Sequence, residues 1–393
     1  MAEAVMPAPT MTSPPRAATT LHGVLLCAMS CLSVLGAVLL APVLPAIEKS
    51  FVGTPGVSVL VPVALTIPAL MIGLLSPFAG SIVDRVGRRR LLIVALVAYG
   101  FVGMAPLVLD SLPLIVVTRA GVGITEAAIM TCCTTLIVDY YDGAARVRWL
   151  GMQTVAAALA ATVFFGVGGA LGANGWRTPF WLYALAFPLA VAAAAFIWQP
   201  APTARRDLPA FPFKVLLAPV LVTVFGGIIF YAPIVEVSYV LDAAGITSTV
   251  VIGAVGAAAS LSTAVGGIVF SRIGTLGTRR LLVAAFSTAG AGLVLFALAR
   301  PLPLIVVGIV LAGVGTGLLL PSLLTWAVSH LEFDERGRGT GLWTAALFIG
   351  DFICPLLVLA AAGVLGGLSA ALVALGVLSF VMVAVTRAVV PRG

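Results

Sequence analysis

Long runs of apolar residues dominate the chain, and each run is long enough to cross a membrane as a helix. A spanning helix needs about 20 residues to cross the hydrocarbon layer. Charge-free runs predict helices over residues 23–47, 50–83, 91–109, 149–176, 178–204, 215–235, 243–271, 281–299 and 301–331. Two further spans, 112–138 and 339–362, carry isolated charges, and the glycine-interrupted run 352–386 contains the end of one helix and a whole second one. The pattern predicts an all-α membrane protein with twelve transmembrane helices.

The composition excludes a water-soluble globular protein. Apolar residues make up 61% of the 393 residues, charged residues make up 9%, and the mean hydropathy is +1.20. Soluble domains contain roughly 25% charged residues. The spans nearly fill the chain, the phosphate-binding sequence Gly-x-x-x-x-Gly-Lys-Ser/Thr is missing, and the only histidines are His22 and His330. We therefore expect no enzymatic activity and no cofactor.

All five cysteines fall inside predicted helices. Cys27 and Cys31 are four residues apart and share a helix face, but His22 lies off that face and His330 is distant. Buried cysteines commonly act as small packing residues. The sequence predicts neither a metal site nor a disulfide framework.

The basic residues are partitioned between the two sides of the predicted topology. With the 85–90 loop in the cytoplasm, 17 of the 21 Lys and Arg residues are cytoplasmic: Arg16, Arg85, Arg88, Arg89, Arg90, Arg146, Arg148, Arg205, Arg206, Lys214, Arg272, Arg279, Arg280, Arg336, Arg338, Arg387 and Arg392. Lys49, Arg177 and Arg300 lie on the other side. Because cytoplasmic loops of membrane proteins are rich in Lys and Arg, both termini are predicted to be cytoplasmic, in a multi-pass protein of the inner (cytoplasmic) membrane. The net charge of +7 thus reflects orientation in the lipid bilayer and indicates no nucleic-acid partner.

A repeat at an offset of 187 residues divides the chain into two halves. Gly80-Ser-Ile-Val-Asp84-Arg85-Val-Gly87 corresponds to Gly267-Ile-Val-Phe-Ser271-Arg272-Ile-Gly274, with serine in place of the aspartate. Parallel repeats are typical of secondary transporters. We predict a disordered tail over 1–20, a six-helix bundle over 21–198, a polar, proline-rich cytoplasmic linker over 199–213 and a second six-helix bundle over 214–388.

The loop between the second and third predicted helices carries a family signature. Its residues Gly80-x-x-x-Asp84-Arg85-x-Gly87-Arg88-Arg89 resemble motif A of the major facilitator superfamily. Weaker matches are Arg119-x-x-x-Gly123, which resembles motif B, Trp176-Arg177-x-x-Phe180, Arg336-Gly337-x-Gly339 and Phe230-Tyr231. The resemblance covers nearly the whole chain, and it is strongest to the twelve-helix bacterial drug/proton antiporters. It implies two pseudo-symmetric bundles and transport of a small molecule by a monomer through alternating access.

Motif A further implies a conformational latch made of Gly80, Asp84, Arg85, Gly87, Arg88 and Asp139. Asp84 is expected to face the positive N-terminus of helix eleven, which is predicted to begin near Gly341. Arg88 is expected to pair with Asp139 at the end of helix four. In the resembling family such contacts hold the halves together in the outward-facing state. The alternative interpretation is that these charges only anchor loops and set the topology.

Charged residues inside the predicted spans are the strongest candidates for function. An ionised side chain in hydrocarbon costs at least a few kcal/mol, so it usually faces a partner or a cavity. The candidates are Arg119 and Glu126 in helix four, Glu236 in helix seven and Asp351 in helix eleven. Arg119 and Glu126 are seven residues apart and share a helix face, about two turns from each other.

In the resembling fold, helices one, four, seven and ten line the substrate cavity. Arg119, Glu126 and Glu236 are therefore expected to converge there as substrate-binding residues. Desolvation favours the neutral form of a carboxylate, whereas a nearby cation favours the charged form. We expect Glu126 beside Arg119 to switch between the two forms and couple transport to protons, with Asp351 and Glu236 as alternative proton-coupling sites. A structural ion pair is the alternative role for Glu126.

One departure concerns helix five. Antiporters of the resembling family often carry Gly-Pro-x-x-Gly-Gly there, whereas this chain has Gly166-Val-Gly168-Gly169 without the proline. The glycines still predict close packing against helix eight at Gly253 and Gly256.

Three functions remain open from the sequence. The first is proton-coupled export of small apolar or cationic compounds. The second is a proton-coupled importer or a facilitator of a small organic anion held by Arg119. The third is a non-transporting membrane sensor or lipid-handling protein on the same fold.

Overall fold

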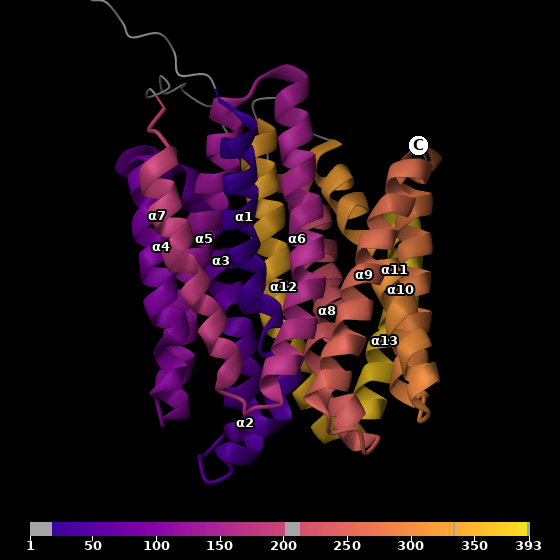
Figure 1. Cartoon of the computed structure of the whole chain (residues 1–393). Helices are drawn as coiled ribbons and strands as arrows, with labels where there is room; N and C mark the ends of the chain where they lie inside the picture. The colour runs from indigo at the N-terminus through magenta and orange to yellow at the C-terminus, as the bar shows by residue number, and fades with distance from the viewer. Residues whose placement is uncertain (1–17, 201–212, 330, 333–334, 391–393) are drawn as a thin grey trace, which may run out of the picture.

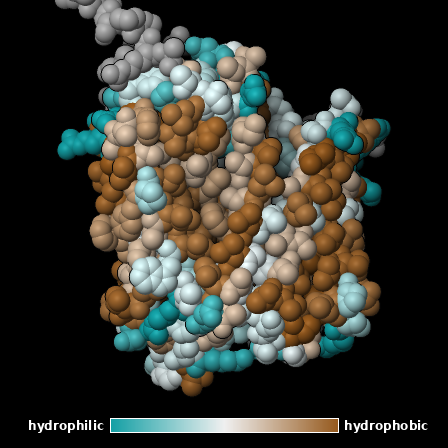
Figure 2. All heavy atoms as spheres, viewed as in Figure 1, coloured by the Kyte–Doolittle hydropathy of each residue, from teal (hydrophilic) through white to brown (hydrophobic). Residues whose placement is uncertain are grey.

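The computed structural model describes residues 18–200, 213–329, 331–332 and 335–390. The predicted tail and linker therefore lie mostly outside the described residues, as does the side chain of Asp84. Within the described part of the chain, twelve helical segments are long and apolar enough to cross a membrane, so the predicted all-α fold with twelve spans is confirmed. Figure 2 shows a broad apolar band with hydrophilic residues gathered at its two ends, as expected for a multi-pass membrane protein.

The first half of the chain forms six spans (Figure 1). The first is broken: α1 (Thr20–Val38) is followed by the short 3-10 helix η1 (Ala41–Val43) and by α2 (Leu44–Ser50). The next four are formed by α3 (Val57–Val86), α4 (Arg88–Met104) with η2 (Ala105–Leu107), α5 (Leu112–Tyr140) and α6 (Gly143–Gly172). The sixth begins as the 3-10 helix η3 (Thr178–Leu185) and continues as α7 (Ala186–Phe196).

The second half forms six more spans. They are α8 (Phe213–Ala243), α9 (Thr249–Ile273) with the 3-10 helix η4 (Gly274–Leu276), α10 (Thr278–Leu298), α11 (Leu302–Ser329), α12 (Arg336–Leu365) and α13 (Leu368–Val389).

Several predicted boundaries were wrong. The seventh span, α8, ends at Ala243, eight residues beyond the predicted limit of 235. The eleventh span, α12, begins at Arg336 and not near Gly341, because its first turn extends beyond the apolar run with the arginines in the polar layer. The sixth span ends at Phe196, eight residues before the predicted limit, and Trp198 and Pro200 already belong to the connection that follows.

The two halves meet through close helix contacts. Gly169 of α6 faces Gly253 of α9: a Cβ added to Gly169 would lie 2.8 Å from the Gly253 Cα. Phe165 of α6 similarly covers Gly256 of α9. The predicted glycine contact between helices five and eight is therefore confirmed. A second line of contact joins α3 to α12, where Gly73 lies against Ala345 and Ile349.

The two ends of the molecule differ. We call the end that carries Gly87, Tyr141 and Arg336 the basic end, and the end that carries Lys49 and Asp242 the opposite end. At the opposite end the halves are joined by an ion pair between Lys49 and Asp242, with 3.1 Å between the Lys49 Nζ and the Asp242 Oδ1. The conformation is therefore closed at the opposite end.

Candidate functional site

Arg119 is fully buried inside the first half, in the first third of α5. Its Nε donates to the Ala64 carbonyl at 3.1 Å, one terminal nitrogen donates to the Gly36 carbonyl at 2.7 Å, and the other donates to the Tyr183 hydroxyl. The guanidinium also lies over the Tyr183 ring, 5.6 Å from its centroid. All three nitrogens of the guanidinium thus donate hydrogen bonds within the first half.

The local sequence creates the two carbonyl acceptors. Pro68 has no N–H, so the Ala64 carbonyl in α3 lacks the donor that a regular helix supplies four residues later. The Gly36 carbonyl lies in the last turn of α1, where helix carbonyls lack intrahelical donors. The C-terminal end of a helix also carries partial negative charge, which favours a cation there. Arg119 therefore donates to one carbonyl without a helical donor in each of two helices, α3 and α1, and is stabilised by the end of α1.

Glu126 lies on the same face of α5 and is 1% exposed. The Tyr99 hydroxyl has one proton, which it shares between the Leu32 carbonyl at 2.6 Å and the Glu126 Oε1 at 3.3 Å. The carboxylate packs on the bare backbone of Gly36: a Cβ there would overlap Glu126. Glycine at position 36 is therefore required for the close approach of α5 to α1.

Two tyrosines connect the arginine to the glutamate. The rings of Tyr99 and Tyr183 lie 5.0 Å apart between centroids, with Tyr183 bonded to Arg119 and Tyr99 to Glu126. We call Arg119, Glu126, Tyr99 and Tyr183 the buried cluster. The sequence analysis missed both tyrosines because tyrosine counts as apolar in a hydropathy pattern. Two signals were available. The chain has only six tyrosines, and a buried tyrosine hydroxyl needs a hydrogen-bond partner.

Glu236 and Asp351 occupy a separate region in the second half. Glu236 on α8 is 5% exposed and Asp351 on α12 is 2% exposed. Neither makes an ion pair with a basic side chain within the described residues. Asp351 packs against bare backbone of α8, since a Cβ on Gly227 would lie 3.2 Å from the Asp351 Oδ1.

Arg119 and Glu126 lie together, and Glu236 lies apart from them in this conformation; their convergence on a substrate cavity stays a prediction. The buried cluster points inward among α1, α3, α4 and η3 of its own half, because Arg119 and Glu126 find their acceptors and donors there. Glu236 has no charged partner from that cluster. The common helix face of Arg119 and Glu126 was predicted; the neighbours of that face are decided by tertiary packing.

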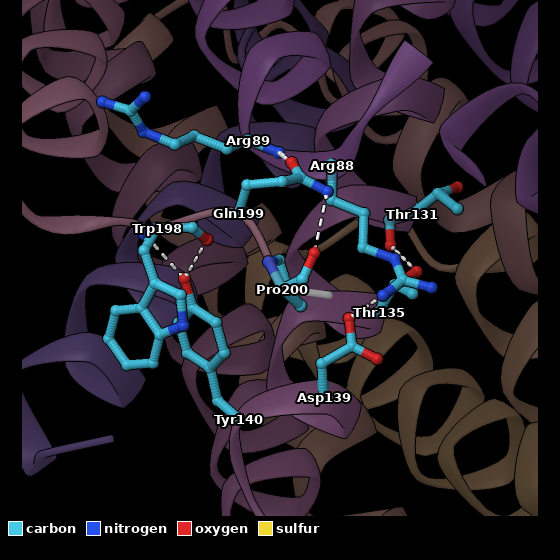
Figure 3. Close-up of polar contacts among 9 residues, drawn as sticks. All are labelled: Arg88, Arg89, Thr131, Thr135, Asp139, Tyr140, Trp198, Gln199 and Pro200. Carbon is cyan, nitrogen blue, oxygen red and sulfur yellow. Dashed lines mark hydrogen bonds and ion pairs between the residues drawn. The ribbon is translucent and has the colours of Figure 1, made fainter. Parts of the chain in front are cut away.

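At the basic end, Arg88 at the start of α4 forms the predicted ion pair with Asp139 near the end of α5 (Figure 3). Both residues belong to the first half, so this pair ties two helices of one bundle together. Its role in a latch stays a prediction. Gly80 and Arg85 belong to the last turns of α3, and Gly87 ends that helix with a φ of 92°, which favours glycine.

The sixth span is fastened to the same region (Figure 3). Gln199 accepts a hydrogen bond from the Arg89 amide at 3.0 Å, and the Arg89 guanidinium donates to the Ala194 carbonyl. The Tyr140 hydroxyl donates to the Trp198 carbonyl at 2.6 Å, and the two rings stack. Arg89 thus anchors a loop, which was the alternative interpretation for the motif A arginines.

The comparison with known proteins decides the family. The family model of the Major Facilitator Superfamily matches residues 26–247 and 217–393, which together cover most of the chain. This chain belongs to the Major Facilitator Superfamily. Like the other proteins of this family matched here, it is a transporter and not an enzyme.

Two curated relatives are drug-resistance proteins. This major facilitator protein is 27% identical over 154 residues to the class B tetracycline resistance protein of Escherichia coli, covering 39% of this chain and 38% of the relative. It is 28% identical over 163 residues to the quinolone resistance protein NorB of Staphylococcus aureus, covering 40% of this chain and 33% of the relative. The matches thus span only about a third of the length of these relatives.

Solved structures agree in fold. A bacterial homologue of the human lysosomal transporter Spinster, in an inward-facing and occupied conformation, superposes with a TM-score of 0.77 at 16% identity, over 93% of this chain and 95% of the other. The human organic anion transporter MFSD10 gives a TM-score of 0.69 at 17% identity, over 94% and 100% of the two chains.

Proposed function

We propose that this protein is a proton-coupled exporter of small apolar or cationic compounds in the cytoplasmic membrane, with its basic end in the cytoplasm. The observation that carries the proposal is the excess of buried acid. Among the residues that the structure describes, three carboxylates are buried in the spans, at Glu126, Glu236 and Asp351, against one buried cation, Arg119. Buried charge without compensation is costly, so these acids favour binding of protons or of a cationic substrate. The similarity to tetracycline and quinolone resistance proteins supports export of such compounds.

In the proposed mechanism Glu126 exchanges a proton. When Glu126 is ionised, it compensates the charge of Arg119 and accepts the Tyr99 hydrogen bond. When Glu126 is protonated, Arg119 keeps only neutral partners, namely two carbonyls and the Tyr183 hydroxyl. The cluster then favours a different position of the α1 end, because Arg119 and Glu126 both contact Gly36. Protonation would thereby change the relative energy of two conformations.

Transport by purified protein in proteoliposomes tests the proposal. Efflux of ethidium, tetracycline and a fluoroquinolone is measured with and without an imposed pH gradient. We expect the gradient to drive accumulation by the parent protein. Glu126→Gln, which resembles the protonated acid in shape, should lose gradient-driven accumulation and keep passive exchange. Accumulation by Glu126→Gln equal to that of the parent would reject Glu126 as the coupling residue.

A facilitator of organic anions held by Arg119 is less well supported. The guanidinium is 0% exposed and already has three hydrogen-bond partners in its own half. An anionic substrate would have to displace them. Stimulated exchange of a labelled dicarboxylate, without any response to lipophilic cations, would favour the anion function over export.

A further inference from the structure

We infer that Asp351 is a second proton-binding site, located in the half opposite to the buried cluster, and that Tyr231 transmits its state to α1. The inference rests on the proposed proton-coupled function, which it deepens by assigning a site and a mechanism of control. It concerns the hydrogen bond that joins the two halves at the end of α1.

The first observation is that Asp351 lacks a partner. Its Oδ1 is buried and makes no hydrogen bond to any of the residues that the structure describes. Asp351 is 2% exposed, and leaving a carboxylate ionised in such a place costs several kcal/mol. Glu126, by contrast, has Tyr99 and Arg119 beside it. Asp351 is therefore expected to be neutral in this conformation.

The second observation concerns the surroundings of Asp351. The helices packed against α12 are α3, α8, α11 and α13. Of these, α8 contributes Tyr231 and Glu236 near Asp351, and α12 itself contributes Cys354. Helix α11 contains no charged or titratable residue, and those of α3 and α13 lie at the basic end: Asp84, Arg85 and Arg387. No basic side chain therefore compensates an ionised Asp351 locally.

The third observation links Asp351 to the other half. Tyr231 lies one turn after Gly227, the residue against which Asp351 packs, and the groups that act electrostatically on its hydroxyl are Asp351, Arg119, Glu126 and Cys354. That hydroxyl donates to the Ala37 carbonyl of α1 at 2.8 Å. Ala37 follows Gly36, whose carbonyl accepts from Arg119. Adjacent carbonyls at the end of α1 are thus bound by different halves of the protein.

The helix containing Asp351 is also built to bend there. Pro355 lies four residues later and has no N–H, so the Asp351 carbonyl lacks its helical donor. Proline positions of this kind are where helices kink. Gain or loss of a proton at Asp351 can therefore alter the bend of α12 as well as its contact with α8.

The proposed control follows from competition for one hydroxyl. Neutral Asp351 leaves Tyr231 bonded to Ala37, which holds the opposite end closed. An ionised Asp351 is a stronger acceptor than a carbonyl, because hydrogen bonds to charged groups are stronger than neutral ones. It draws the Tyr231 hydroxyl away from Ala37 and releases the closed state. Proton loss to the cytoplasm thereby prepares the protein to open outward.

Double electron–electron resonance, which measures the distance between two spin labels, tests this inference. Spin labels at Val52→Cys and Thr247→Cys report on the opposite end, since both positions are exposed and belong to different halves. Cys31, which is partly exposed, is changed to serine, and the four buried cysteines stay. The protein is placed in nanodiscs and measured between pH 8.5 and 5.5. The parent should gain several-fold in the short-distance population as the pH falls.

The variants separate the two acids. Asp351→Asn should show the short distance already at pH 8.5, so that its pH response is reduced to the part due to Glu126. Tyr231→Phe should reduce the short-distance population at low pH about fivefold, the effect of one net hydrogen bond of about 1 kcal/mol, and should also flatten the response. Glu236→Gln is the control: it removes the other buried acid of the second half and should keep the full pH-dependent shift. Glu126→Gln should keep the part of the shift that is due to Asp351.

A parental pH response in Asp351→Asn, or in Tyr231→Phe if the first variant does not fold, would overturn the inference. The flux assay tests the proposed function separately. Loss of the distance response without loss of gradient-driven flux would remove the Asp351 assignment and leave proton-coupled export standing. A retained distance response without any gradient-driven flux would reject proton-coupled export and leave the Asp351 assignment standing.

Discussion

The contact between Gly169 and Gly253 gives the sharpest prediction about the closed end. A Cβ on Gly169 would lie 2.8 Å from the Gly253 Cα and would overlap the Thr249 carbonyl. Carbon atoms in contact are normally about 3.5–4.0 Å apart, so Gly169→Ala must move α6 and α9 apart by about 1 Å. Overpacking of this kind costs about 1–3 kcal/mol. Because the contact joins the two halves, the cost falls on the closed opposite end.

The expected result is a population shift of about five- to 150-fold away from the closed state, which corresponds to that free energy. The labels at Val52 and Thr247 measure it as loss of the short distance. Gly166→Ala is the matched control: it lies one turn earlier on α6, and a Cβ there meets nothing within 4 Å. If Gly169→Ala and Gly166→Ala give the same distance distribution and the same thermal stability, close glycine packing does not stabilise the closed end.

Two further predictions concern the ends of the molecule. For the topology, cysteines at Ser111 and Thr275 should be labelled by an impermeant reagent from opposite sides of the membrane, because the basic residues concentrate at the end that carries Thr275; labelling of both from outside would reject the orientation. For the latch, Asp84→Asn should increase cysteine accessibility at the basic end by up to several-fold, the effect of about 1 kcal/mol lost at a helix terminus; normal expression with unchanged accessibility would favour a loop-anchoring role.

Periodicity and charge were sufficient for the fold. All twelve spans were predicted because a continuous apolar run has few alternatives to a membrane helix. The first span shows what a hydropathy pattern does not predict, namely a break within a continuous apolar run. Hydropathy treats residues 23–47 as one helix, yet α1 stops at Val38 and the 3-10 helix η1 follows, with Pro42 near its start. The break matters for function because it frees the carbonyls of Gly36 and Ala37.

The burial of the four candidate residues was predicted correctly, but most of their hydrogen-bond partners were not predicted. Arg119, Glu126, Glu236 and Asp351 are all buried, as expected of charges inside apolar helices. Their partners depend on how each helix is rotated about its own axis. That rotation is set by contacts with other helices and not by the local sequence. Lys49 and Asp242 illustrate the same limit, since nothing in their local sequences indicates that residues so far apart close one end together.

Alternating access requires an element whose position both halves influence, and the end of α1 meets that requirement. Arg119 holds the Gly36 carbonyl from the first half, and Tyr231 holds the Ala37 carbonyl from the second. The first bond lies within one bundle and can persist through rocking, whereas the second crosses between bundles and must break when the opposite end opens. A proton site that acts on the second bond therefore changes the balance between the two conformations directly. The proton site proposed at Glu126 would act on the same helix end from the first half, because Glu126 packs on Gly36.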